Sequence, residues 1–126
     1  DSSVISFVYR NEMGWGGERY LGESGARSFN PQITANSVND IFVVWEDRKS
    51  GYSEIYVNTF LKEEQAWKGE IRLSEYSKNC YNPSVSSYFD DVYVTWTSEE
   101  DDDKTSIELI KYNLYSGQSS EISKAS

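Results

Sequence analysis

The chain has 126 residues, with 21 acidic and 12 basic side chains, so its formal net charge is −9. A surface of that charge repels phosphates and anionic headgroups, which argues against a nucleic acid partner and against membrane insertion. Histidine is absent and Cys80 is the one cysteine, which excludes a Ser-His-Asp triad, an internal disulfide and a thiolate zinc site. We therefore expect no cofactor and no metal, and a packing role for Cys80.

Matched landmarks recur along the chain at a spacing of 51 or 52 residues. They are two Asn-Pro pairs, two leucines and two pairs of tryptophans: Asn30-Pro31 and Asn82-Pro83, Leu21 and Leu73, Trp15 and Trp67, Trp45 and Trp96. Agreement at one spacing predicts a structural repeat of about 50 residues, in which each unit holds four short strands.

The first 25 residues match only the second half of a unit. Val4–Tyr9 is expected to form a third strand and Glu18–Leu21 a fourth strand. Between them, the glycine-rich Gly14–Gly17 predicts a flexible, exposed turn that carries Trp15. This segment supplies no first and second strand, so upstream sequence or another chain has to complete the sheet.

The second unit covers residues 26–76. Its strands are predicted at Pro31–Ala35, Ile41–Trp45, Glu54–Phe60 and Ile71–Ser74. Proline suits the first residue of a strand, where no ladder donor is required. The second strand is apolar on both faces, as expected for a strand packed between neighbouring sheets. Trp45, which ends that strand, is therefore predicted to be buried.

The third unit covers residues 77–126, with strands predicted at Pro83–Ser87, Val92–Trp96, Ser106–Tyr112 and Glu121–Ser123. Trp96 is predicted to be buried in the same way as Trp45. The acidic run Glu99–Asp103 lacks the glycine-punctuated alternation of a calcium loop, so we expect a solvated loop there. The whole chain is predicted to be all-β, with about ten strands and no helix beyond a single turn.

The unit resembles the repeat of sialidase-like β-propellers. The residues that carry the resemblance are Asn30-Pro31-Gln32-Ile33, the run Ile41–Trp45, Glu46-Asp47-Arg48, and Glu54-Ile55-Tyr56-Val57. The resemblance implies about two and a half four-stranded antiparallel blades of an incomplete propeller: a half blade 1–25, a blade 26–76 and a blade 77–126. The family's Asp-box turn, Ser-x-Asp-x-Gly-x-Thr-Trp, is degenerate here, because the stretch Phe60–Trp67 keeps only its tryptophan.

Sialidases of that family clamp the substrate carboxylate with three arginines and use an Asp acid/base with a Tyr-Glu nucleophile pair. None of the five arginines in this chain lies in a matching motif. We therefore assign no catalytic residue and expect a non-catalytic binding or scaffolding module. The alternatives are a fragment of a larger sialidase-like glycan-processing enzyme, and an oligomeric lectin assembled from short chains.

Two residues are candidate ligand contacts. Trp15 lies in the exposed glycine-rich turn, where its ring could stack on a sugar, and Arg48 follows the strand that ends in Trp45. The expected partners are the remaining blades of a longer chain or further copies of this one, together with a glycan or protein ligand. The chain opens at Asp1, which fits a processed segment and a secreted or cell-surface location.

Overall fold

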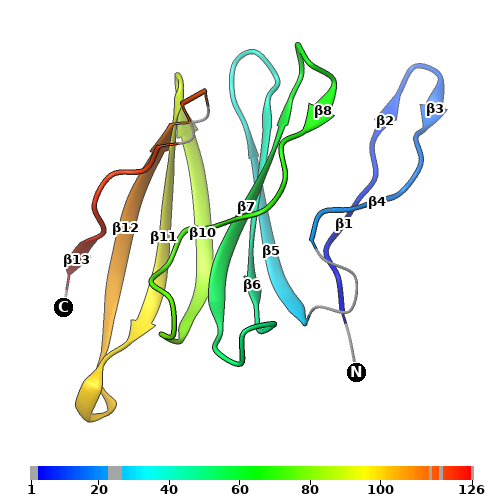
Figure 1. Cartoon of the computed structure of the whole chain (residues 1–126). Helices are drawn as coiled ribbons and strands as arrows, with labels where there is room; N and C mark the ends of the chain where they lie inside the picture. The colour runs from blue at the N-terminus through cyan, green and yellow to red at the C-terminus, as the bar shows by residue number, and fades with distance from the viewer. Residues whose placement is uncertain (1–2, 23–26, 114, 117, 126) are drawn as a thin grey trace.

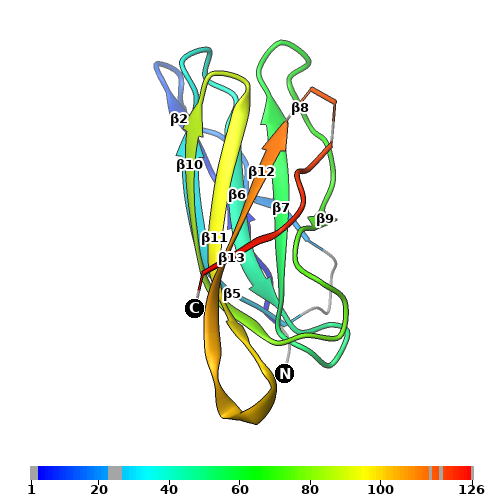
Figure 2. The same cartoon turned by 90° about the vertical axis from the view of Figure 1, so that its left-hand side faces the viewer.

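The chain folds into three layers of antiparallel β-structure that follow one another along the sequence and stack face to face (Figures 1 and 2). The computed structural model describes residues 3–22, 27–113, 115–116 and 118–125. The first layer holds two short antiparallel pairs. They are β1 (Ser6–Phe7) with β4 (Arg19–Tyr20) and β2 (Arg10–Asn11) with β3 (Gly14–Trp15).

The central sheet is built from one continuous meander. Its strands are β5 (Ser28–Ala35), β6 (Ile41–Asp47), β7 (Glu54–Leu61), β8 (Ala66–Trp67) and β9 (Ile71–Arg72). β5, β6 and β7 pair in order, and β8 and β9 both pair with the outer edge of β7. The outermost strand is thus one strand position, interrupted at Gly69, whose φ is +102°.

The third sheet repeats the meander in the order β10-β11-β12-β13. Its strands are β10 (Cys80–Tyr88), β11 (Asp91–Glu99), β12 (Thr105–Asn113) and β13 (Ser123–Ala125). The connection between β11 and β12 contains a single 3₁₀ turn, η1 (Asp101–Asp103). β10 packs against β5 and β6, so the inner strands of the two sheets lie next to each other.

The outer strand pairs of all three layers share one register. Equivalent residue pairs, each about 52 residues from the next, are Arg10–Trp15, Phe60–Trp67 and Tyr112–Ser119 at one level, and Ser6–Tyr20, Tyr56–Arg72 and Glu108–Lys124 at another. The repeat found in the sequence is therefore present in the backbone pairing. The expected boundary between residues 25 and 26 lies outside the described residues.

The repeated Asn-Pro pair forms a β-bulge. Asn30 and Asn82 have φ values of 53° and 55°, and the register shifts at these positions in both β5 and β10. Asparagine tolerates this left-handed conformation. At a bulge the ladder needs no N–H from the extra residue, so proline, which has none, is accepted there. Our prediction that proline starts each first strand was wrong, because both strands begin three residues earlier, at Ser28 and Cys80.

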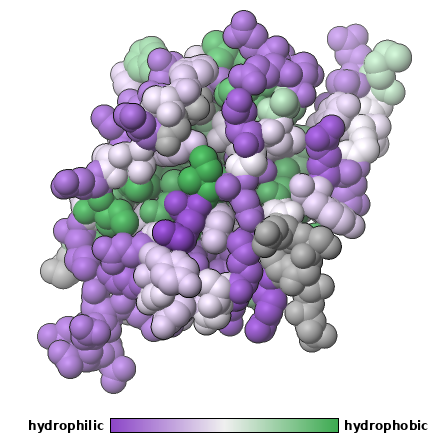
Figure 3. All heavy atoms as spheres, viewed as in Figure 1, coloured by the Kyte–Doolittle hydropathy of each residue, from purple (hydrophilic) through white to green (hydrophobic). Residues whose placement is uncertain are grey.

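Two apolar clusters hold the layers together. Trp45 and Val43 project from β6 toward Ile5 and Leu21 of the first layer. The opposite face of the central sheet packs on the third sheet through twelve buried residues: Phe42, Val44, Ile55, Val57, Leu61, Leu73, Cys80, Val92, Val94, Trp96, Ile110 and Tyr112. Trp45 and Trp96 are 0% and 1% exposed, so their predicted burial is confirmed. In the space-filling view, apolar side chains are visible at mid-height, with others near the upper end (Figure 3).

The predicted all-β class is confirmed, and in the part of the chain that the structure describes no sheet closes on itself. The described residues form thirteen strands instead of about ten, because the outer strand of the central sheet is interrupted and the first layer contains two separate pairs. The described residues include no helix that is long and apolar enough to cross a membrane.

Candidate functional site

A cleft of about 700 Å³ opens between the first layer and the central sheet. It lies at the end of the stack where the β2–β3 hairpin and the β7–β8 hairpin turn (Figure 1). Four aromatic residues line it: Phe7 and Tyr9 from the first layer, and Phe60 and Trp67 from the central sheet. The cleft therefore exists only because two layers that are separate in sequence meet here.

The aromatic wall is built around Trp67. The ring centroids of Trp67 and Phe7 are 4.9 Å apart in an edge-on arrangement, and those of Trp67 and Phe60 are 5.5 Å apart. Tyr9 extends the wall outward, since its ring lies 6.5 Å from that of Phe7 and its side chain is 50% exposed. Gly16 lies so close to this tyrosine that a Cβ there would be 2.2 Å from the ring, so a larger residue would require the half-exposed Tyr9 ring to move.

Polar side chains line the rest of the cleft. Glu18 and Arg19 come from the segment at the start of β4, and Lys62 and Gln65 come from the β7–β8 turn. The β7–β8 turn is anchored to the residue that precedes β6, because the Lys62 amide donates to the buried Asp40 carboxylate at 2.9 Å. The site thus combines apolar ring surface with an amide, a guanidinium, an ammonium and a carboxylate.

The two ligand contacts proposed from sequence are not brought together. Trp15 is 69% exposed on β3, beside the cleft but not in its lining, and the Arg10 guanidinium lies 5.9 Å from its ring centroid. Arg48 follows the end of β6 that is remote from the cleft, and its guanidinium lies 5.3 Å from the Phe29 ring centroid. Neither residue lines the cleft, and nothing in the structure tests either of them as a ligand contact elsewhere.

Sequence reasoning did not select Trp67 as a ligand contact, although it is the repeat counterpart of Trp15. Both tryptophans occupy the same register in their outer hairpins. They differ in what lies beside them, because Trp67 faces a preceding layer that carries Phe7. The position of each tryptophan in the repeat could have distinguished them. Trp67 lies in the second unit, so a preceding layer is available to form a cleft with it.

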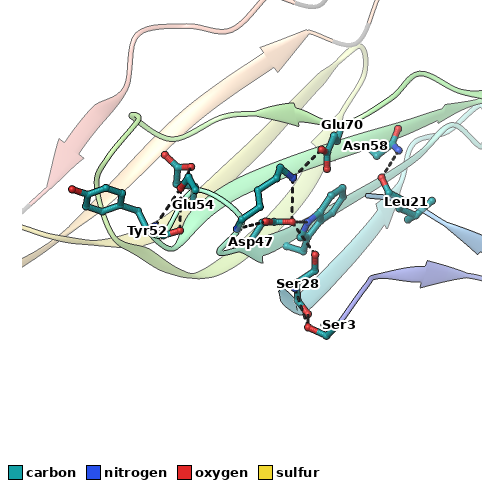
Figure 4. A network of polar contacts seen from close by, with 11 residues as sticks. Ser3, Leu21, Ser28, Asp47, Tyr52, Glu54, Asn58 and Glu70 are labelled. Carbon is teal, nitrogen blue, oxygen red and sulfur yellow. Dashed lines mark hydrogen bonds and ion pairs between the residues drawn. The ribbon is translucent and has the colours of Figure 1, made fainter. Parts of the chain in front are cut away.

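A buried polar network lies at the other end of the first interface (Figure 4). The Asp47 carboxylate accepts hydrogen bonds from the Ser28 hydroxyl at 2.8 Å and from the Trp45 indole at 3.3 Å. Lys49 pairs with this carboxylate at 3.3 Å and with Glu70 at 2.8 Å. Burial lowers the pKa of Lys49, but the hydrogen bond to Glu70 and the charge of Asp47 outweigh it, so the pKa is raised overall. This network is a structural ion pair that holds a charged lysine at pH 7.

A second network performs the same task in the third sheet. The Trp96 indole donates to the buried Glu108 carboxylate at 2.8 Å, and the Lys78 ammonium lies 3.1 Å from its other oxygen. Glu100 joins through Lys78 at 3.4 Å and Lys124 at 2.9 Å. Burial lowers the pKa of Lys78, but its hydrogen bonds to Glu108 and Glu100 raise it well above the ordinary value overall. The buried carboxylates of both networks are therefore neutralised by lysines.

The remaining reactive groups have structural surroundings. Cys80 is fully buried in the cluster between the central and third sheets, and burial raises the pKa of its thiol to about 11. Its predicted packing role is confirmed. In the acidic run, Glu99 accepts from the Tyr81 hydroxyl at 2.7 Å, whereas Asp101–Asp103 form the exposed turn η1. Among the described residues there is no group of three or more Cys, Asp or Glu placed to hold a metal ion.

Comparisons of the chain with protein-family models, with curated proteins and with solved structures gave no match.

Proposed function

We propose that the chain is a non-catalytic run of sialidase-like propeller blades that serves as a binding module and takes a short glycan in the cleft around Trp67. The observation that carries the proposal is the combination of aromatic rings and hydrogen-bonding side chains in one cleft of about 700 Å³. Ligand sites are concave and mostly apolar, with a few polar groups that fix orientation.

The propeller part of the proposal is supported by the stacking. Consecutive four-position meanders pack face to face, with inner strands β5 and β10 adjacent, and each buries a tryptophan against the preceding layer. A propeller is such a set of sheets arranged around an axis. In this arrangement, the 51–52-residue repeat is one blade, and the first layer is the outer half of a blade.

The glycan part of the proposal follows from the chemistry of the lining. The aliphatic C–H face of a pyranose ring packs on an aromatic ring, while its hydroxyls need donors and acceptors. Phe7, Tyr9 and Trp67 supply the ring surface, and Arg19 and Gln65 supply polar groups of both kinds. We favour a sugar, because the lining combines ring surface with hydrogen-bonding side chains.

The proposal predicts that changes in the cleft weaken glycan binding and that a change beside it does not. A glycan array would select the ligand, and isothermal titration would measure its affinity. Arg19→Ala and Gln65→Ala should each weaken binding by about tenfold, the worth of one hydrogen bond to a charged or well-placed group. Trp67→Phe, which keeps the packing on Phe7, should also weaken binding.

Trp15→Ala is the matched control, because this exposed tryptophan lies on the neighbouring hairpin outside the lining. Binding should be unchanged in this variant, and any bound sialoside should be recovered intact. The proposal would be overturned by an array without a binder, or by affinity that depends on Trp15 and ignores the cleft variants.

A further inference from the structure

The first layer is the repeat counterpart of β7 to β9, and no described residue supplies the counterpart of β5 and β6. In the central sheet, β7 pairs with β6 along one edge and with β8 and β9 along the other. In the first layer, β1 pairs with β4 along one edge, and within the described residues no strand pairs with its other edge. Two adjacent strand positions are therefore open beside β1.

The first layer is nevertheless seated as a complete layer would be. The Ser28 amide donates to the Ser3 carbonyl at 3.1 Å, and the Ser3 hydroxyl donates to the Ser28 carbonyl at 2.9 Å. The repeat counterparts make the same two contacts: the Cys80 amide to the Ser53 carbonyl and the Ser53 hydroxyl to the Cys80 carbonyl, both at 2.7 Å. The first layer is therefore placed against β5 as the central sheet is placed against β10. This shared placement defines where the two open strand positions lie.

The open positions leave one face of β5 uncovered. Every second residue of this strand points toward the first layer, and all three of these residues, Pro31, Ile33 and Ala35, are exposed. Their counterparts in β10 face the central sheet and are covered. Pro83 is buried, Val85 packs on the core, and the half-buried Ser87 donates to the Ala35 carbonyl at 3.0 Å.

Ile33 shows the difference most clearly. Its side chain is 59% exposed, although it pairs across the sheet with Val43, which is buried. Its counterpart Val85 occupies the same place one layer later and packs against the central sheet. The exposure of Ile33 therefore has a specific cause, since no described residue of the first layer supplies the strand that would cover it. An apolar strand face next to a free strand edge is a template for an added strand.

We propose that the free edge of β1 and the exposed face of β5 together form an acceptor surface for a two-stranded β-hairpin that lies outside the described residues. The hairpin is of the β5–β6 type. Its second strand pairs with β1, its first strand covers Ile33, and apolar residues equivalent to Phe42 and Val44 face the central sheet. A single strand does not suffice, because β5 lies two strand positions away from the edge of β1. The inference rests on the layer repeat and is independent of the glycan cleft.

The test presents the chain's own hairpin, residues Arg27–Arg48, on a soluble carrier protein and titrates it into the isotopically labelled chain. Binding should protect the Ser6 amide, whose neighbours Ile5 and Phe7 already pair with β4, from hydrogen exchange and should shift the Ile33 methyl resonances. Carrier alone, and a carried hairpin with Phe42→Asp and Val44→Asp, should do neither. Absence of both effects with the intact hairpin overturns the proposal, whatever the outcome of the glycan titration.

Two variants of the chain distinguish specific binding at the acceptor surface from nonspecific hydrophobic association. Ile33→Asp should reduce hairpin affinity at least about tenfold, because a charge is placed against the incoming strand. Val38→Asp is the matched control, since Val38 is 58% exposed but lies in the turn after β5. Both side chains are exposed, so neither change should unfold the free chain. Equal loss of affinity in the two variants overturns the assignment of the surface.

Discussion

At the scale of single residues, two equivalent buried tryptophans obtain their hydrogen-bond acceptors from different positions in the sequence. Trp45 and Trp96 are repeat counterparts, and each buries an indole N–H that needs an acceptor. Asp47, on the same strand, serves Trp45 at 3.3 Å, whereas Glu108, on the next strand, serves Trp96 at 2.8 Å. Each buried indole N–H needs an acceptor, but the carboxylate that accepts from it can come from the same strand or from the next one.

These tryptophans give the first residue-scale prediction. Trp45→Ala or Trp96→Ala should lower the free energy of unfolding by roughly 3–5 kcal/mol, because each leaves a large cavity and removes the indole hydrogen bond to a buried carboxylate. Urea unfolding followed by circular dichroism would measure the change. Trp15→Ala, at an exposed position, should change stability by less than about 0.5 kcal/mol. A loss below about 1 kcal/mol at the buried sites would contradict their role in the layer interfaces.

At the scale of elements, the connection between β11 and β12 divides the acidic run into two parts. Asp101–Asp103 form an exposed turn, and Glu100 is held where the chain reverses. The Ser106 hydroxyl donates to Glu100 at 2.5 Å, and Lys124 of β13 and Lys78 of the preceding loop lie within ion-pair distance. One carboxylate therefore ties the outermost strand β13 to the loop at its edge.

This clamp predicts a pH dependence. The hydrogen bond from Ser106, followed by those from Lys124 and Lys78, lowers the pKa of Glu100 from 4.5 to about 2. A lowered pKa means that the stabilisation is present above pH 4.5 and is lost as the pH falls toward 2. Glu100→Gln should therefore unfold more easily at pH 7 and lose less stability between pH 4.5 and 2. Urea midpoints across this range would measure the effect, with Asp102→Asn, in the exposed turn, expected to follow the parent chain.

At the scale of the whole molecule, no described element covers the outward face of the third sheet. The outward face of the third sheet carries Ile107 and Leu109, which are 50% and 39% exposed. Their repeat counterparts Ile55 and Val57 are buried beneath the third sheet. In repeat architectures each layer covers its neighbour, and terminal layers without a polar outer face associate with other surfaces.

We therefore expect the isolated chain to self-associate through this outward face. Sedimentation velocity or light scattering at micromolar concentration should show a dimer or a larger species. Ile107→Asp together with Leu109→Lys should shift the population toward monomer without lowering the unfolding midpoint, because both side chains are already exposed. A parent chain that stays monomeric at all concentrations would show that the outward face needs no cover.

Much of the fold was predictable from the sequence, and particular residues show why. The apolar runs in β6 and β11 and the paired tryptophans set strand positions and burial, because both depend on local pattern. The strand starts were missed at Asn30 and Asn82, because a left-handed residue within a strand leaves no periodic signal. The interruption of the outer strand at Gly69 was missed for the same reason.

The candidate site was harder to predict. Trp15 stood out because glycines surround it, yet it stacks with Arg10 in its own layer. Trp67 follows a polar turn whose sequence gives no sign of a binding site. It lines the cleft because Phe7 of the first layer packs against it, with the ring centroids 4.9 Å apart. A contact between layers joins residues 60 positions apart, and no local pattern encodes which of two equivalent tryptophans acquires a neighbour.

By itself, the sequence determined the all-β class, the repeat and its phase, and the burial of Trp45 and Trp96, because hydrophobic spacing alone dictates these. The tertiary structure decided which surfaces are covered and which remain open. The cleft at Trp67, the exposure of Ile33 beside its buried partner Val43, and the open face at Ile107 all depend on whether a layer lies opposite. Burial of a face is a property of two layers, so it is settled only when the layers stack.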